Sequence, residues 1–143
     1  MSTLASARAA SAYGQAAPTG ADAGMIVMLY DGIARHVRAA RAAVLAGAIE
    51  ERWRCVGKAA AIVEGLQDCL DHTRGGAVAR SLDAWYTQLG LQLQRINLRN
   101  DVAACDAVLA QLATMRASWA AVAGQAPVAA PPPPVERPAA RIA

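Results

Sequence analysis

The chain has 143 residues, which is enough for one domain with a substantial core. Its residues are 55% hydrophobic, yet only 4% are aromatic and phenylalanine is absent, so alanine, valine and leucine must supply most of the core. This composition favours closely packed helices over sheets. No apolar run approaches the roughly 20 residues of a membrane-spanning helix, and the N-terminus lacks a signal-peptide pattern. We therefore expect no stable membrane insertion.

The formal net charge of +3 could suit a nucleic-acid partner, but the positions of the charges argue against one. Most of the excess of basic residues lies near the chain ends, and within residues 21–124 the basic and acidic residues nearly balance. Arg35, Arg38 and Arg41 form a basic stripe at helical spacing. A solvated helix face explains this stripe better than an anionic partner does.

The two ends of the chain differ in composition from its middle. Residues 1–20 are rich in alanine and serine, so we expect a flexible segment with at most a short helix, around Leu4 to Tyr13. Residues 125–143 include the run Pro131–Pro134, which predicts an extended, disordered polyproline tail. A ligand for SH3-type domains is the minor alternative for this tail. Residues 21–124 are predicted to form the folded domain.

The first long helix is predicted to run from about Asp22 to Ala46. Asp22 suits the N-cap position and Gly47 the C-cap position. The apolar residues of this segment recur with a period of 3.6 residues. They are Met25, Met28, Leu29, Gly32, Ile33, His36, Val37, Ala40 and Val44. The part from Met25 to Ile33 is apolar on almost every side, so it must be covered by the rest of the bundle and the N-terminal segment, or by a partner.

Three further amphipathic helices are predicted over about residues 50–70, 77–98 and 101–123. Gly75-Gly76 marks the expected turn between the second and third helices, and Asn100 or Asp101 suits the cap of the fourth. The apolar positions of the three helices are Trp53, Val56, Ala60, Val63, Leu66 and Leu70; Val78, Leu82, Trp85, Leu89, Leu93 and Ile96; and Val102, Cys105, Val108, Leu112, Met115, Trp119 and Val122. Four such helices joined by short loops predict an all-α, antiparallel up-down four-helix bundle.

The three cysteines show no metal-binding spacing. They are Cys55, Cys69 and Cys105. Cys55 and Cys69 share a predicted helix and lie roughly 20 Å apart at a rise of 1.5 Å per residue, so they cannot form a disulfide with each other. We expect all three to be buried thiols on or near apolar faces, as in a reducing cytoplasm.

No pattern of catalytic or cofactor-binding residues emerges from the sequence. Neither His36 nor His72 has a glutamate three positions before it, as a di-iron bundle requires. Gly75-Gly76 lacks the lysine of a phosphate-binding loop. Asp68, Asp71 and His72 could meet as a metal site, but a polar helix end beside a loop explains them more simply. We therefore expect no enzymatic activity, no cofactor and no metal, because a bundle enzyme would need polar residues in the core.

Three aromatic residues invite a nucleic-acid interpretation. Tyr30, Trp85 and Tyr86 could stack against bases, but no cluster of basic residues accompanies them in the sequence. Packing in the core or at an interface explains these side chains better. The sequence therefore predicts no nucleic-acid partner.

Five short blocks along the chain carry a family resemblance. They are Ala12-Tyr13, Met28–Gly32, Leu70-Asp71 followed by Gly75-Gly76, Asn97–Asp101, and Trp119. In order and spacing these blocks resemble the FliS family of flagellar secretion chaperones, from about Ala12 to Val122. Each block alone would be weak evidence, but all five in register are specific. The resemblance implies a helical bundle of the bacterial cytosol.

The resemblance also implies a client. FliS-like proteins bind the C-terminal segment of flagellin, which is disordered in the monomer, prevent its premature polymerisation and deliver it to the flagellar type III export gate. Other flagellar regulators are possible further partners, and neither nucleotide nor metal is implied. A disordered client that folds into apolar grooves agrees with the alanine-rich faces of this chain. The alternative is a helical adaptor or regulator that binds another flagellar or secretion protein.

The predicted partner-binding residues follow from these blocks and from the helix faces beside them. In the family, an aromatic residue in the place of Tyr13 can cap a groove for which the client competes. Asp31 is expected to hydrogen-bond at the bundle end, and Gly32 to allow a neighbouring backbone to approach. Asn97 and Asp101 are expected to satisfy backbone groups at two helix ends. The full predicted set for flagellin or the export gate is Tyr13, Met25, Met28, Leu29, Tyr30, Ile33, Trp85, Tyr86, Ile96, Asn97 and Leu98.

Overall fold

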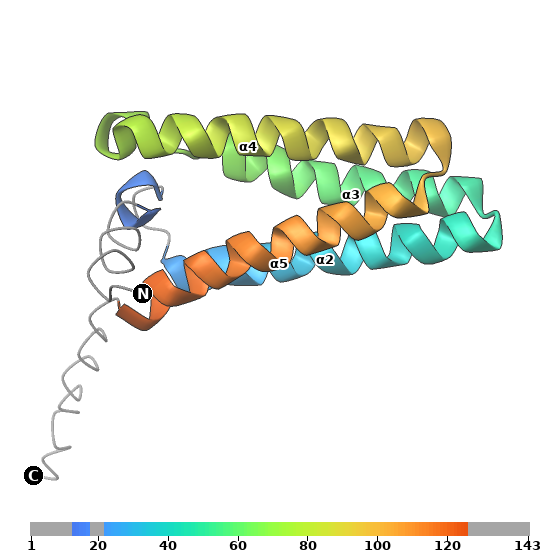
Figure 1. Cartoon of the computed structure of the whole chain (residues 1–143), viewed down its shortest axis with the longest axis horizontal. Helices are drawn as coiled ribbons and strands as arrows, with labels where there is room; N and C mark the ends of the chain where they lie inside the picture. Colours follow the sequence, from blue (N-terminus) through green and yellow to red (C-terminus); the bar gives the residue numbers. More distant parts are fainter. Residues whose placement is uncertain (1–12, 18–21, 126–143) are drawn as a thin grey trace, which may run out of the picture.

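The structure is a computed structural model that describes residues 13–17 and 22–125. Its four long helices are α2 (Ala23–Ala46), α3 (Ile49–Asp68), α4 (His72–Arg99) and α5 (Val102–Gln125). Successive helices run antiparallel and pack side by side, and α5 returns to pack against α2 (Figure 1). This arrangement confirms the predicted all-α, up-down bundle. The predicted disorder of the proline-rich tail concerns residues outside the described range.

A short helical turn (residues 13–16) precedes the four long helices, and we call residues 13–17 the cap segment. It lies at the end of the bundle where α4 begins and α5 ends (Figure 1). The helix expected around Leu4 to Tyr13 falls almost entirely on residues that the structure does not describe. None of the described helices is both long and apolar enough to cross a membrane.

Helix α2 has the ends that the sequence predicts. The carboxylate of Asp22 accepts a hydrogen bond from the Met25 N–H at 2.6 Å, which satisfies one of the free amides of the first turn. Gly47 has a φ of +70°, and its N–H bonds back to the carbonyls of Ala43 and Val44. A residue with a side chain would be strained at this φ, so glycine ends the helix here.

The turn between α3 and α4 lies earlier than predicted, at residues 69–71. The Asp71 carboxylate accepts a hydrogen bond from the Arg74 N–H at 2.9 Å and so starts α4 before the two glycines. Gly75-Gly76 therefore lies inside α4, and the prediction that it marks the turn is wrong. Gly76 adopts φ +50° and ψ −123°, which kinks the helix after its first turn.

The core is formed by one face of each long helix. Its largest fully buried side chains are Trp119, Tyr30, Tyr86, Ile33, Leu82, Leu89, Leu93, Ile96, Leu112, Val37, Val63 and Val108. Most of the predicted apolar positions are buried or packed against this core, which confirms the helical periodicity.

Two positions that we expected to be buried are exposed. Trp53 is 66% exposed, because the buried stripe of α3 passes through Arg52, Cys55 and Val56 and leaves residue 53 outside it. Cys69 is exposed because it lies at the end of α3, past the last core position. Cys55 and Cys105 are buried as predicted, and burial raises the pKa of both thiols.

Candidate functional site

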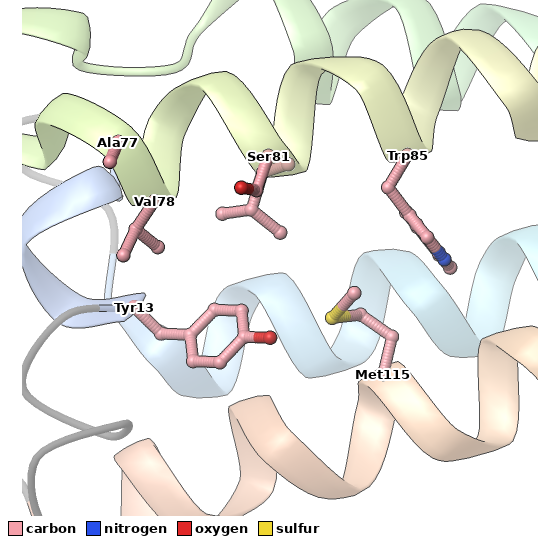
Figure 2. A pocket seen from close by; sticks show the side chains of 7 residues that line it. Tyr13, Ala77, Val78, Ser81, Trp85 and Met115 are labelled. Atoms are coloured by element: carbon pink, nitrogen blue, oxygen red, sulfur yellow. The ribbon is translucent and has the colours of Figure 1, made fainter.

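An apolar groove separates α4 from α5 at the end of the bundle that holds the cap segment. The two helices meet at their connecting turn and diverge toward this end (Figure 1). The resulting cavity has a volume of about 480 Å³. It is lined by Tyr13, Ala77, Val78, Ser81, Leu82, Trp85 and Met115. We call it the α4–α5 groove. Figure 2 shows the Tyr13 ring reaching into it from the cap segment, opposite Val78 and beside Met115.

The cap segment is held by small residues and by one hydrogen bond to the bundle. Ala16 is fully buried, and its carbonyl oxygen accepts a hydrogen bond from the Asp71 N–H at 3.1 Å. A Cβ atom on Gly75 would lie only 2.8 Å from the Ala16 Cα, so glycine is required for this close approach. The ring of Tyr13 meets Trp119 edge to face, with centroids 5.4 Å apart. These contacts place Tyr13, as the resemblance implies, at the mouth of a groove.

Behind the groove, three buried side chains form a hydrogen-bonded network that joins α2, α4 and α5. The hydroxyl groups of Tyr30 and Tyr86 lie 2.7 Å apart, and the Trp119 indole Nε1–H donates to the Tyr30 hydroxyl at 3.2 Å. The Trp85 ring stacks on Tyr30 with centroids 6.0 Å apart. We call Tyr30, Tyr86 and Trp119 the aromatic network. The polar atoms of all three side chains are hydrogen-bonded, which offsets the free-energy cost of burying them.

The aromatic network predicts a loss of stability at alkaline pH. Burial raises the pKa of Tyr86 to about 12 and that of Tyr30 further above its ordinary value. The unfolded chain releases both protons above about pH 10 while the folded chain keeps them, so the free energy of unfolding should fall as the pH rises beyond that point. Denaturant unfolding at increasing pH measures this fall. Ionisation of Tyr30 and Tyr86 in the folded protein near their ordinary pKa would contradict the prediction.

The predicted partner residues of α2 divide between the surface and the core. Met25, Met28 and Leu29 are 50%, 73% and 38% exposed and lie on one face at helical spacing. Tyr30 and Ile33 are buried, at 1% and 0%. In this structure only the first three offer surface to a partner, and we call them the α2 patch.

The predicted residues at the end of α4 divide in the same way. Leu98 is 82% exposed, whereas Ile96 is fully buried. The Asp101 carboxylate accepts a hydrogen bond from the Ala104 N–H at 3.1 Å, which confirms its capping role. Asn97 does not cap α4, contrary to prediction. The C-cap of α4 is Asn100, which has a φ of +49°. Its N–H donates a hydrogen bond to the Ile96 carbonyl at 3.0 Å.

The expectations for Asp31 and Gly32, both in the Met28–Gly32 block, have different outcomes. Asp31 does hydrogen-bond, to Arg116 of α5, with a shortest contact of 2.6 Å. This bond to Arg116 lowers the pKa of the Asp31 carboxyl, although both side chains are exposed. Gly32 is not approached by a neighbouring backbone. A Cβ atom there would make an ordinary contact, 3.5 Å from the Ile62 side chain, so that expectation is wrong.

A second groove, which the sequence reasoning missed, lies between α3 and α4. Its volume is about 410 Å³, and we call it the α3–α4 groove. Trp53 and Leu91 line it and are 66% and 56% exposed. Gly57 and Gly90 also line it, and a Cβ on either would meet nothing within 4 Å. Of the predicted partner residues, Tyr86 and Asn97 belong to this lining. Glycines within otherwise regular helices were the signal that could have revealed it.

The residues considered for metal binding do not assemble into a site. Asp71 is used to cap α4. Over residues 13–17 and 22–125, no group of three or more His, Cys, Asp and Glu side chains could hold a metal ion. The described surface does offer apolar grooves and exposed apolar residues, whose chemistry suits protein segments.

Comparison with known proteins gives a consistent set of relatives. The family model described as flagellar protein FliS matches residues 5–126. The flagellar secretion chaperone FliSB of Pseudomonas aeruginosa is 34% identical over 95 residues, which are 66% of this chain and 75% of that protein. The flagellar secretion chaperone FliS of Salmonella typhimurium is 30% identical over 103 residues, 71% and 76% of the two chains. That of Campylobacter jejuni is 38% identical over 77 residues, 54% and 60% of the two chains.

Proposed function

The chain belongs to the FliS family of flagellar secretion chaperones, and from this premise we propose that its client is the C-terminal segment of flagellin. The chaperone binds this disordered segment in the bacterial cytosol, prevents premature polymerisation and delivers flagellin to the flagellar type III export gate. Burial of apolar client residues drives the binding, because the described surface offers apolar grooves.

The observation that carries the proposal is the α4–α5 groove with Tyr13 at its mouth. Its lining is mostly apolar along α4 and flexible at Met115, which suits the apolar face of a helix that folds on binding. A client helix in this groove would meet Val78 and Leu82 on one side and Met115 on the other. The client would therefore have to displace the Tyr13 ring or pack against it.

The cap segment has the properties of a competitor for the groove. A single backbone hydrogen bond, from Asp71 to Ala16, the buried Ala16 and Ala17 and the Tyr13 ring hold it, all within five residues, so it can leave without unfolding the four helices. While Tyr13 covers the groove, the apparent affinity for the client is reduced by the fraction of time that the groove is closed. The same cover protects apolar surface in the free chaperone.

The α2 patch and the α3–α4 groove offer further contacts for a long client. Met25 and Met28 have unbranched, adaptable side chains that suit a partner of variable sequence. Trp53 and Leu91 present large apolar groups beside the α3–α4 groove. A client of several helices can use several of these surfaces, which are spread around the bundle.

The test is calorimetric titration of the protein with a peptide from the flagellin C-terminus. We expect 1:1 binding with a large negative heat-capacity change, from apolar burial and coupled folding. Ala77→Glu places a charge in the α4–α5 groove and should weaken binding about tenfold or more, which is roughly 1.4 kcal/mol. Ala113→Glu alters an exposed alanine of α5 outside the described grooves and should leave the affinity within about twofold.

Three results would count against the proposal. Full binding of flagellin that lacks its C-terminal segment would exclude that segment as the client. Equal affinity of the Ala77→Glu and Ala113→Glu variants would exclude the α4–α5 groove. Co-purification of a different flagellar or secretion protein in near-equal amount, without flagellin, would favour the adaptor alternative.

A separate prediction concerns Leu29 of the α2 patch. Because its side chain is 38% exposed, Leu29→Ala should lower the free energy of unfolding by less than about 2 kcal/mol. Ile33, one turn later and fully buried, is the matched control, and Ile33→Ala should cost about 2–5 kcal/mol. If the α2 patch contacts the client, Leu29→Ala also weakens peptide binding. Unchanged stability and unchanged affinity together would remove Leu29 from both roles.

A further inference from the structure

Arg52 is the one charged residue that is buried among those the structure describes, at 8% exposed. Its Nη1 donates to the side-chain oxygen of Asn100, while its Nε–H has no acceptor within the described part of the chain. The ion pairs found among the described residues involve other arginines, so no carboxylate neutralises this guanidinium there. A buried cation without an anion is costly, which points to a missing partner.

Arg52 lines a cavity of about 280 Å³. The α2–α3 loop lies at the end of the bundle opposite the cap segment (Figure 1). The cavity is bordered by the α2–α3 loop and by Asn100 of the α4–α5 turn. Its lining is Ala43, Val44, Gly47, Ala48, Ile49, Arg52 and Asn100.

The same cavity contains the start of α3. The N-cap residue is Ala48, which has no side chain that could accept a hydrogen bond from the first turn. The positive end of a helix and an incompletely bonded guanidinium therefore border one small space. Both supply donors, and within the described part of the chain no carboxylate accepts a hydrogen bond from either.

We propose that this cavity binds a carboxylate, in the first place the C-terminal carboxylate of a peptide chain. A guanidinium matches the two oxygens of a carboxylate, and a single cation balances a single negative charge. The aliphatic side chains of Ala43, Val44 and Ile49 line the same cavity and suit an apolar last residue. Glu50 and Glu51 in the first turn of α3 oppose a more highly charged ligand such as a phosphate dianion.

The size of the cavity agrees with this ligand. It lies near the lower limit of small-molecule pockets, so it accommodates one terminal residue rather than a nucleotide. A partner whose last residue is held here would be anchored at the end of the bundle away from the α4–α5 groove. This site is independent of that groove and does not require that the partner be flagellin.

The test uses two probes that differ in a single functional group, N-acetyl-leucine and N-acetyl-leucinamide. Each is titrated into the full-length protein while the side-chain Nε–H resonance of Arg52 is followed by NMR. We expect a saturable shift with the acid and none with the amide. N-acetyl-aspartic acid α-amide carries its only carboxylate on the side chain, so a stronger shift with it would identify an acidic side chain as the natural source of the carboxylate.

Arg52→Gln and Arg54→Gln provide the matched variants. Arg54 lies on the same helix but is exposed and paired with Glu51, so Arg54→Gln should keep the response of the α3 first-turn amides to N-acetyl-leucine. Arg52→Gln should lose it. If Arg52→Gln does not fold, the comparison of acid and amide in the unmodified protein still decides. Equal responses to both probes, or a response that persists in folded Arg52→Gln, would overturn the proposal.

Discussion

Replacing Gly75 by alanine is expected to release the cap segment while the four helices stay folded. The added Cβ would lie 2.8 Å from the Ala16 Cα and 2.9 Å from the Ala16 Cβ, closer than such atoms approach in real structures. It would also lie 2.8 Å from the Ala79 Cβ in the next turn of α4, which must shift as well. The cap segment is only five residues long and is joined to the bundle by one backbone hydrogen bond, so its departure is the less costly response. Alanine also favours the helix by about 1 kcal/mol relative to glycine.

Hydrogen exchange measures this release directly. The Asp71 N–H donates to the Ala16 carbonyl, so its protection should fall in Gly75→Ala while amides in the middle of α4 keep theirs. Under the proposed function, the flagellin peptide should also bind more tightly, because Tyr13 no longer competes for the groove. Gly90→Ala is the control on the same helix, since a Cβ there meets nothing within 4 Å. Unchanged Asp71 protection in Gly75→Ala would show that the cap segment does not depend on this contact.

The architecture was predictable because its signals are local. The hydrogen bond of Asp22 and the positive φ of Gly47 set the ends of α2, and both depend on residue type within one turn of helix. The 3.6-residue periodicity likewise located most of the core. The position of the α3–α4 turn was predicted wrongly because a glycine pair usually ends a helix. Here Gly76 kinks α4, and Gly75 lets Ala16 of the cap segment pack closely against the helix.

The candidate site was predictable only in part, because it depends on contacts between distant segments. The resemblance pointed to Tyr13, but Gly75 and Met115 become relevant only when three segments meet at the α4–α5 groove. Arg52 carries a weak local signal, since it lies one turn before Val56 on the buried stripe of α3. Its lack of an anionic partner can be seen only in three dimensions.

Trp119→Ala is expected to have the largest effect on stability. The side chain is 1% exposed, donates its indole N–H to Tyr30 and packs against the Tyr13 ring. Truncation removes a large apolar volume and leaves a cavity, which costs about 3–5 kcal/mol. Denaturant unfolding followed by circular dichroism measures the loss. The cap segment should loosen at the same time, because Tyr13 loses the ring against which it packs.

Two further tryptophan variants separate packing from hydrogen bonding. Trp119→Phe keeps most of the apolar volume but removes the donor to Tyr30, so it should cost much less than the alanine variant, with about 1 kcal/mol from the lost hydrogen bond. Trp53→Ala removes a tryptophan that is 66% exposed, so it should change stability by less than about 1 kcal/mol. Equal losses for Trp119→Ala and Trp53→Ala would mean that Trp119 is not part of the core. A loss for Trp119→Phe as large as that for Trp119→Ala would instead place most of its contribution in the hydrogen bond, because the phenylalanine ring still fills most of the space.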